Sequence, residues 1–339
     1  MTSETSETLM SAAPLVPDIK PTPTKARTDL GVASLVLGEG VTVKAVGVVY
    51  GLEHTIRGDA YEAVVFLDHY NQRLRVLEYR ADDVEPMVMA LRVLADANGF
   101  DKILVMASHD DWQAFLGSGY VLEAVLQYFH AGVDAFVVSK FRSQERLSSP
   151  NLMEETLLIE RIMAERAIGR GRELPEGYAV RLAVRDDIPA LLRLYRTIFE
   201  SYPSPLVHAS YLEHVFQRES IFAVCVDEGG EVVAAASAEL TPSKRAAELT
   251  DCATSPAARG KGLMSRILAH LEGELCRREY LCAYTMARAR SFGMNSVFHQ
   301  LGYAYTGRLI NNCDIYGAYE DMNIWVRDLR RPPAAAAAE

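Results

Sequence analysis

Cysteine is scarce in this chain, which holds five in 339 residues, an odd number without a C-x-x-C pair. Disulfide frameworks and structural zinc sites need paired or clustered cysteines at characteristic spacings. We therefore expect no metal site, and reduced thiols in a reducing, cytoplasmic compartment. The cysteines are Cys225, Cys252, Cys276, Cys282 and Cys313.

Long apolar runs are also missing. No stretch approaches the roughly 20 apolar residues of a membrane span. Residues 1–28 are rich in Pro, Ser, Thr and Glu and lack the basic and apolar regions of a signal peptide. We expect no membrane association, and we expect disordered tails at residues 1–28 and 330–339.

Basic residues are outnumbered by acidic ones, since the net charge is −10 and the pI is about 5.4. A basic surface is the usual mark of a nucleic-acid-binding protein, so we expect no nucleic-acid partner. The hydrophobic fraction of 49% and charged fraction of 24% are typical of a globular protein. This length suits two domains.

The periodicities divide the chain into two α/β segments with mixed sheets, at residues 29–150 and 178–329. A helix and a Gly-rich linker at residues 151–177 separate them. In the second segment the expected order is β-α-β-β-β-α-β-α-β-β. In the first, the expected elements are strands at 63–68, 74–79, 102–106, 121–128 and 135–140, and helices at 84–98 and 111–116. Both segments place Gly-Tyr after a short helix, at Gly119-Tyr120 and Gly302-Tyr303, so we expect the first to be a degenerate copy of the later half of the second.

The strongest local motif is Pro256-Ala-Ala-Arg-Gly-Lys-Gly-Leu-Met264, between an expected strand and an expected amphipathic helix. Glycines allow a ligand to approach the backbone, and a helix N-terminus offers unpaired N–H groups to an anion. R-G-x-G alone is more often a surface loop, but this context favours a pyrophosphate cradle. Its residues are Arg259, Gly260, Lys261, Gly262, Leu263 and Met264.

The motif resembles the acetyl-CoA loop of the GNAT (GCN5-related N-acetyltransferase) superfamily, Gln/Arg-x-x-Gly-x-Gly/Ala, with Met264 in place of the last small residue. The P-loop and Rossmann spacings are absent. The resemblance implies a C-terminal GNAT fold and acetyl-CoA as cosubstrate. In the first segment the corresponding helix entry, Arg80 to Glu85, is acidic and lacks Gly, so the expected copy should not bind CoA.

Acetyl transfer to an amine needs a base, because a lysine-like ammonium has a pKa near 10.4. The resemblance places a carboxylate on the strand before the loop, where Glu248 and Asp251 lie. Simple alternation would turn these two to opposite faces, so either is a candidate for the base. The usual acid Tyr is replaced by Phe298, which leaves Tyr303, Tyr284 or solvent. The resemblance also assigns Cys252, Ala253, Thr254 and Asn295 to the cofactor.

The segment from Ala287 to Leu329 is similar to the beta-lysine N-acetyltransferase family, through the runs Ala-Arg-Ala-x-Ser, Gly-Met-Asn, Leu-Ile-Asn-Asn and Glu-Asp-Met-Asn-Ile-Trp. This resemblance covers most of residues 30–329. It implies acetylation of the ε-amine of L-β-lysine to Nε-acetyl-β-lysine, a compatible solute, with lysine 2,3-aminomutase as a pathway partner. The expected acceptor-binding residues are Arg288, Asn311, Asn312, Glu320 and Asp321, whereas Glu239 and Arg290 are more simply surface charges.

Two alternatives stay open at this point. The first is an N-acetyltransferase for another small amine, a polyamine or lysine, against which only the terminal runs argue. The second is a non-catalytic acetyl-CoA-sensing module. The loop and the strand carboxylates argue against this second alternative, and Phe298 argues for it.

Overall fold

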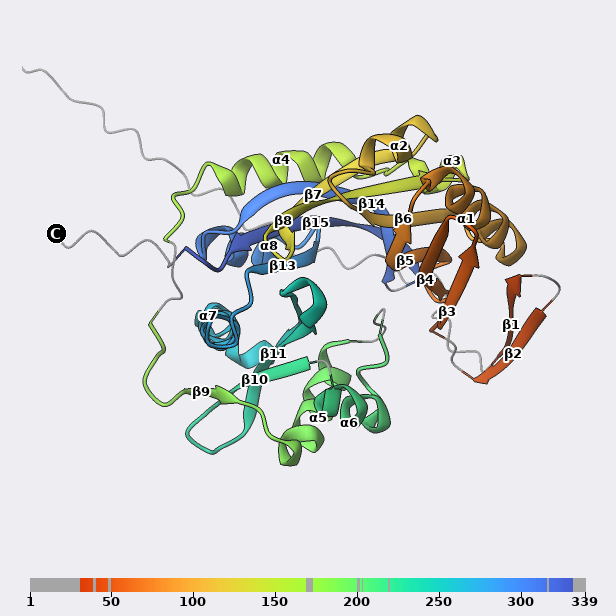
Figure 1. Cartoon of the computed structure of the whole chain (residues 1–339). Coiled ribbons are helices and arrows are strands. Elements are labelled where there is room, and N and C mark those ends of the chain that lie inside the picture. The colour runs from red at the N-terminus through yellow and green to blue at the C-terminus, as the bar shows by residue number, and fades with distance from the viewer. Residues whose placement is uncertain are drawn as a thin grey trace, which may run out of the picture.

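A computed structural model shows the arrangement of the chain (Figure 1). It describes residues 31–38, 41–47, 50–168, 173–199, 202, 204–218, 220–315 and 317–331. The expected tail at residues 1–28, the last eight residues of the second tail and part of the expected linker lie outside these ranges.

The described residues of the first half form a separate hairpin, six strands of the main sheet and four helices. The strands are β1 (Gly31–Gly38), β2 (Val41–Gly47), β3 (Leu52–Gly58), β4 (Tyr61–Asp68), β5 (Arg73–Ala81), β6 (Lys102–Ala107), β7 (Val121–His130) and β8 (Val133–Phe141). The helices are α1 (Val84–Asn98), α2 (Trp112–Gly117), α3 (Gln144–Leu147) and α4 (Leu152–Met163).

The second half contributes seven strands and four α-helices. The strands are β9 (Ala179–Leu182), β10 (Ser220–Val226), β11 (Val232–Thr241), β12 (Ala246–Thr254), β13 (Cys282–Arg288), β14 (Ala304–Ile315) and β15 (Ala318–Asp328). The helices are α5 (Ile188–Ile198), α6 (Ala209–Arg218), α7 (Leu263–Arg277) and α8 (Phe292–Gln300). Short 3₁₀ turns occur at Arg185–Asp187, Pro242–Lys244 and Pro256–Ala258.

Both halves share one 13-stranded mixed sheet, in the order β3-β4-β5-β6-β8-β7-β14-β15-β13-β12-β11-β10-β9. The pairs β5–β6 and β12–β13 are parallel, and the other neighbours are antiparallel. The order β3-β4-β5-β6-β8-β7 in the first half matches β10-β11-β12-β13-β15-β14 in the second. In each half a long helix follows the third strand: α1 follows β5, and α7 follows β12. A short helix comes before the next strand but one along the chain: α2 precedes β7, and α8 precedes β14. The repeated order therefore includes more than the later half that the sequence indicated.

Four apolar cores hold the layers together. One lies between α1, α2 and the first-half strands. Another lies between α7, α8 and the second-half strands, and a third lies under α5 and α6. The fourth joins the halves, since Leu104, Leu126 and Val137 of the first pack with Leu309 and Ile324 of the second. Because this core is shared, the first half forms a fixed wall beside the second.

The sheet is continuous across the halves because β7 and β14 approach closely. Gly307 of β14 pairs with Ala124 of β7, and a Cβ on Gly307 would overlap the backbone oxygen of Glu123. The buried Lys102 forms an ion pair with Glu123 at 2.9 Å and donates to the oxygen of Ile310 at 2.8 Å. The Ile310 amide donates to the Glu123 carboxylate at 2.6 Å. Glycine and a paired charge thus fix this join.

The expected mixed α/β class is confirmed, and so are the expected first-half elements from residue 63 to residue 140, with small shifts at their ends. The structure adds β1, β2, β3, α3 and α6, which the sequence analysis did not identify. It also extends the last two strands across most of residues 312–320, which were expected to be a loop. The reason is that most of these residues are buried against the first half, and this environment does not show in local periodicity.

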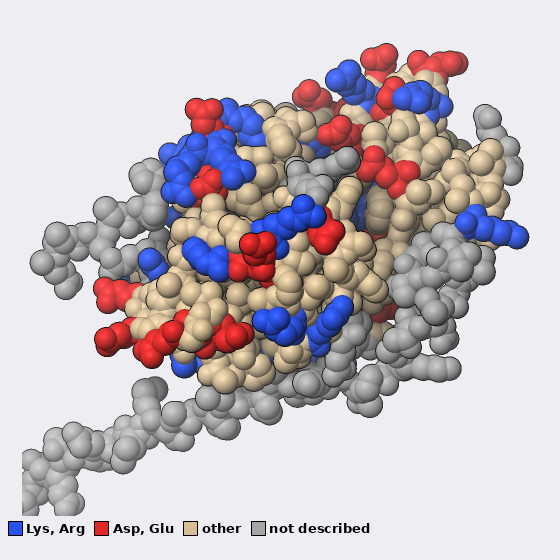
Figure 2. Space-filling model, turned by 90° about the horizontal axis from the view of Figure 1, so that it is seen from below, with Lys and Arg blue, Asp and Glu red and all other residues tan. Residues whose placement is uncertain are grey.

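Charges of both signs are interspersed over the described part of the face drawn in Figure 2. Within the described residues, no helix combines the length and apolar character required to cross a membrane. The described residues also hold no group of three or more His, Cys, Asp or Glu side chains placed to bind a metal ion.

Candidate active site

The glycine loop between β12 and α7, residues 255–262, leaves the N-terminus of α7 accessible. Gly260 and Gly262 have φ of 77° and 74°, and no side chain caps the helix at Gly262. A Cβ on Gly260 would meet no atom within 4 Å, so the space beside the loop is open. Leu263 and Met264 are the first two residues of α7, and their side chains are buried in the core. Only their backbone amides are therefore available to a ligand. The methionine that departs from the family pattern is accommodated in the core.

The two cations of the loop have partners within the protein. Arg259 Nε donates to the backbone oxygen of Thr254 at 3.3 Å, and Lys261 Nζ donates to Tyr178 Oη at 2.5 Å. Both side chains are exposed, so either can turn toward a phosphate at little cost. The loop therefore has the chemistry of an anion site.

A gap opens where β12 and β13 separate. Their parallel pairing runs only from Ala246–Glu248 against Cys282–Tyr284. Beyond it, residues 249–252 of β12 and 285–288 of β13 line one cavity of about 500 Å³. The backbone groups that turn toward the gap are not paired between these two strands. The gap widens toward the end of β12, from which the glycine loop leads to α7.

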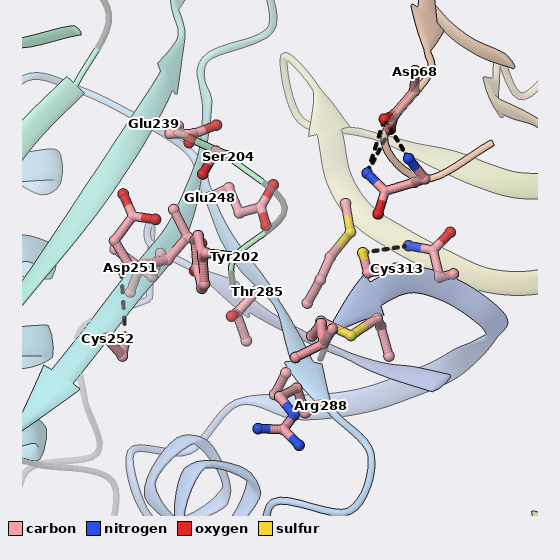
Figure 3. A pocket seen from close by; sticks show the side chains of 18 of the residues that line it. Asp68, Tyr202, Ser204, Glu239, Glu248, Asp251, Cys252, Thr285, Arg288 and Cys313 are labelled. Carbon is pink, nitrogen blue, oxygen red and sulfur yellow. Dashed lines mark hydrogen bonds between the residues drawn. The ribbon is translucent and has the colours of Figure 1, made fainter. Parts of the chain in front are cut away.

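The cavity is built from both halves of the chain (Figure 3). The β11–β12 wall brings three carboxylates, Glu239, Glu248 and Asp251. Asp68 lies across the cavity from these three, on the first half. The other polar lining residues include Asn71, Arg73, Arg75, Tyr202, Ser204, Tyr211, Cys252, Thr285, Arg288, Ser291 and Asn312.

Glu248 and Asp251 share the cavity because β12 is irregular. Asp251 has φ of 54°, and the register with β11 shifts between Ala235 and Ser237. A bulge of this kind turns a side chain from the face that alternation gives it. The expectation of opposite faces was therefore wrong, and both candidate bases line one site.

The acidic wall raises the pKa values of these carboxyls. The pKa of Glu248 is raised to about 8, first by burial and then by the charges of Glu239 and Asp251, whereas Arg75 and Tyr284 lower it. Burial and Glu239 raise the pKa of Asp251 to about 7, against hydrogen bonds from Ser237 and Tyr202. The Ser237 hydroxyl donates to Asp251 at 2.6 Å. Carboxyls that titrate near neutral pH are suited to proton transfer.

Cys252 lies in the lining, but its thiol is not a nucleophile. Burial, followed by the charge of Asp251, raises its pKa well above the ordinary value. A thiol in this state remains protonated and unreactive. Ala253 is buried under α5, and Thr254 lies at the end of β12 beside the glycine loop, so of these three expected cofactor residues only Cys252 lines the cavity.

Asn295 does not face a ligand, contrary to the expectation. Its amide nitrogen donates to the backbone oxygens of Arg288 and Ser291, at 2.9 and 2.7 Å. Its oxygen accepts from Asn323 and Trp325, at 3.0 and 2.8 Å. The side chain is fully buried and has used its hydrogen-bonding capacity, so it joins α8 to the sheet.

Tyr303 is also away from the cavity. Its ring is buried edge-to-face against Phe298, and its hydroxyl lies near Glu272, while Phe298 itself lines the cavity. The expected assignment of Tyr303 as the acid is therefore wrong on geometry, because a core aromatic ring separates its hydroxyl from the reacting groups. Tyr284 is buried beside Glu248, outside the lining.

The expected acceptor residues divide into two groups. Arg288 and Asn312 line the cavity. Glu320 does not, but it forms a bidentate pair with Arg288, at 2.6 Å for each bond. Asn311 lies outside the cavity because its amide caps three backbone oxygens around α3. Asp321 accepts from the backbone N–H of Asn311 at 2.7 Å within the core, so these last two do not line the cavity, contrary to the expectation that they bind the acceptor.

Several lining residues were missed. Glu239, which was interpreted as a surface charge, pairs with Glu248 in the β11–β12 register, and that pairing signals a shared face. Tyr202, Ser204 and Tyr211 come from the segment around α6, which was not predicted as a helix. The first-half residues Asp68, Asn71, Arg73 and Arg75 carried no local signal, because only the join between the halves brings them here.

Comparison with known proteins fits this geometry. The acetyltransferase (GNAT) family model matches residues 177–303. The beta-lysine N(6)-acetyltransferase of Methanosarcina mazei is 35% identical over 72% of this chain and 97% of the relative. The N-acetyltransferase YodP of Bacillus subtilis is 32% identical over 81% and 99%, and the beta-lysine N(6)-acetyltransferase of Methanococcus maripaludis 25% over 78% and 96%. The chain thus belongs to the beta-lysine N-acetyltransferase family of the GNAT superfamily, and it is an N-acetyltransferase that takes its acetyl group from acetyl-CoA.

Proposed function

We propose that this enzyme acetylates the ε-amine of L-β-lysine to give Nε-acetyl-β-lysine. The observation that carries the proposal is the acidic wall, where Glu239, Glu248 and Asp251 line one cavity of about 500 Å³. Such a wall favours an acceptor with more than one ammonium group, and β-lysine has two. Two relatives named for β-lysine acetylation support this choice over a polyamine or lysine.

We infer that the glycine loop holds the cosubstrate. The amides at Gly260, Gly262, Leu263 and Met264 would bind the pyrophosphate, with Arg259 and Lys261 adding charge, and the gap between β12 and β13 would take the arm. Open space beside Gly260 and the uncapped start of α7 support this assignment. Acetyl-CoA supplies the thioester from which the neutral amine takes the acetyl group, leaving the CoA thiol.

Glu248 and Asp251 are the proposed source of the base. Either carboxylate, once ionised, accepts a proton from the acceptor ammonium, so that the amine nitrogen has a free electron pair. Glu239 raises the pKa of both carboxyls, and Asp251 also raises that of Glu248, so ionisation of one carboxyl disfavours ionisation of its neighbour. Near neutral pH Glu248 and Asp251 are therefore partly ionised and partly protonated. The ionised fraction attracts ammonium groups.

We further propose that the first half is a degenerate copy that does not bind CoA. The repeated strand order supports this proposal, and the entry to α1 supports its loss of cofactor binding. At that entry Asp83 caps the helix by accepting from the amide of Glu85 at 3.0 Å, so an acid occupies the position where a phosphate would bind. Lysine 2,3-aminomutase is the proposed supplier of β-lysine, and a cytoplasmic location is proposed with it.

The test is release of CoA thiol by the purified full chain with β-lysine, α-lysine, spermidine or buffer alone. Turnover with β-lysine at a kcat/KM well above that for the others is the expected result. Preference for another amine would keep the acetyltransferase and overturn the acceptor. An absence of turnover with every amine, despite binding of acetyl-CoA, would favour a sensing module.

A further inference from the structure

Strand β5 turns one face of the first half toward the cavity. Its residues alternate, so that Leu74 and Val76 pack under α1 while Arg73 and Arg75 line the cavity. Arg75 pairs in the sheet with Phe66 and Leu104, which line the cavity too. The half without a glycine loop therefore contributes cations to the site of the half that has one.

Among the described residues, three cationic side chains line the cavity, and two of them are already neutralised. Arg73 donates to Asp68 at 2.7 Å, and Arg288 forms its bidentate pair with Glu320. Arg75 forms no hydrogen bond and no ion pair within 4 Å in the described part of the chain. Arg75 and Glu248 line the same cavity, and the charge of Arg75 lowers the pKa of Glu248.

The segment that carries Arg75 is anchored to the second half by its neighbours. Arg73, two residues earlier, also donates to the backbone oxygen of Asn312 at 2.8 Å. Asn71 accepts at 2.8 Å from the amide of Asp314 on the same strand, β14. These bonds join the first-half wall to the second half close to Arg75, so the strand that carries Arg75 is fixed beside the cavity. A half-buried guanidinium without a carboxylate partner is a favourable site for a carboxylate ligand.

We propose that Arg75 binds the carboxylate of the acceptor, so that the first half of the chain selects amino acids over simple amines. The acceptor then lies across the cavity, with its ammonium groups toward Glu239, Glu248 and Asp251 and its carboxylate toward β5. This inference rests on the proposed function, because it takes an amino acid as the acceptor. It also gives the degenerate half a role in specificity.

The test compares two acceptors that differ only in this group, L-β-lysine and its carboxamide. The wild type is expected to favour β-lysine in kcat/KM by roughly 10- to 100-fold, the range for one charge-assisted hydrogen-bonded pair. Arg75→Gln should remove most of this preference by raising KM for β-lysine, and should change kcat/KM for the carboxamide by less than about threefold. Arg75→Lys should retain part of the preference. Arg80→Gln, an exposed cation on the same strand, is the matched control and should behave as wild type.

Two results would overturn the inference. The first is an equal kcat/KM of the wild type for β-lysine and its carboxamide, a result that can be obtained without any variant. The second is an Arg75→Gln enzyme in which both acceptors lose kcat/KM equally and the pH profile shifts, because Arg75 would then act only on Glu248. If the wild type acetylates α-lysine and not β-lysine, the proposed acceptor fails, and α-lysine with its carboxamide then tests Arg75 in the same way.

Discussion

Replacing Glu248 by Gln should change activity and stability in opposite directions. Its carboxyl has a pKa of about 8 in the folded protein, whereas an unperturbed Glu titrates near 4.3. Folding therefore favours the protonated form. The resulting destabilisation is absent below the unfolded pKa, grows as pH rises from about 4 to about 8, and is complete above that. Gln keeps the shape and carries no charge, so the variant should lack this pH-dependent loss.

The magnitude follows from the pKa difference. A shift of three to four units corresponds to roughly 4–5 kcal/mol as an upper bound, at about 1.36 kcal/mol per unit. Part of the shift comes from the charges of Glu239 and Asp251, which remain in the variant, so removing the Glu248 carboxyl recovers only part of this free energy, about 1–3 kcal/mol at pH 9. For a chain of this size that corresponds to a melting temperature about 2–6 °C above wild type at pH 9. At pH 5 the two proteins should melt together.

Activity should fall while stability rises. Loss of a positioned base lowers kcat/KM by about 10²- to 10⁴-fold, and the wild-type profile should rise with pH through about 7 to 8 as the pair ionises. The assays are thermal unfolding at pH 5 and 9 without ligands, and thiol release across pH. Glu231→Gln, an exposed carboxylate of the same half, is the control. An equal melting difference at both pH values would refute the electrostatic argument, and an unchanged pH–rate profile would leave Asp251 as the base, to be tested as Asp251→Asn.

Three other substitutions test the site and the join. Asn295→Ala should lower stability by about 2–4 kcal/mol, since it leaves the buried Asn323 amide and Trp325 indole N–H without an acceptor, while the KM for acetyl-CoA stays within about twofold; a KM increase without loss of stability would restore Asn295 to the cofactor. Gly307→Ala should lower the melting temperature by several degrees, with a cost above about 3 kcal/mol, because its Cβ would overlap the β7 backbone; wild-type unfolding would contradict the join described above. Gly260→Asp should raise the KM for acetyl-CoA by roughly 10-fold or more through like-charge repulsion, whereas the isosteric Gly260→Asn, which meets the same open space, should raise it far less. If both substitutions raise the KM for acetyl-CoA equally, the loop does not bind the phosphate groups of the cosubstrate.

Short-range patterns were enough for much of the molecule. The i, i+3, i+4 spacing of Val84, Met87 and Leu91 fixed α1, and these side chains are buried as expected. The glycine loop was recognised from Arg259 to Met264 because glycine freedom and a following helix are local properties. Strands buried by remote segments, such as residues 312–315, were missed because their environment is supplied by another part of the chain.

The assignment of individual side chains was less successful where a role depends on partners. Asn295 and Asn311 have the residue type expected of a ligand, yet both are used inside the protein as caps. A bulge at Asp251 brought together two carboxylates that alternation separates. Residue type alone does not reveal whether the hydrogen-bonding capacity of an amide or carboxylate is already in use.

The sequence by itself determined most of the helix and strand pattern, the position of the glycine loop and the family, because each depends on residues close together in the chain. Only the tertiary structure decided what faces the acceptor. Arg75 and Glu248 are far apart in sequence. They line the same cavity because β7 joins β14 and the two halves share one core. Charges that act on one another across a cavity depend on distance in space, which spacing along the chain does not specify.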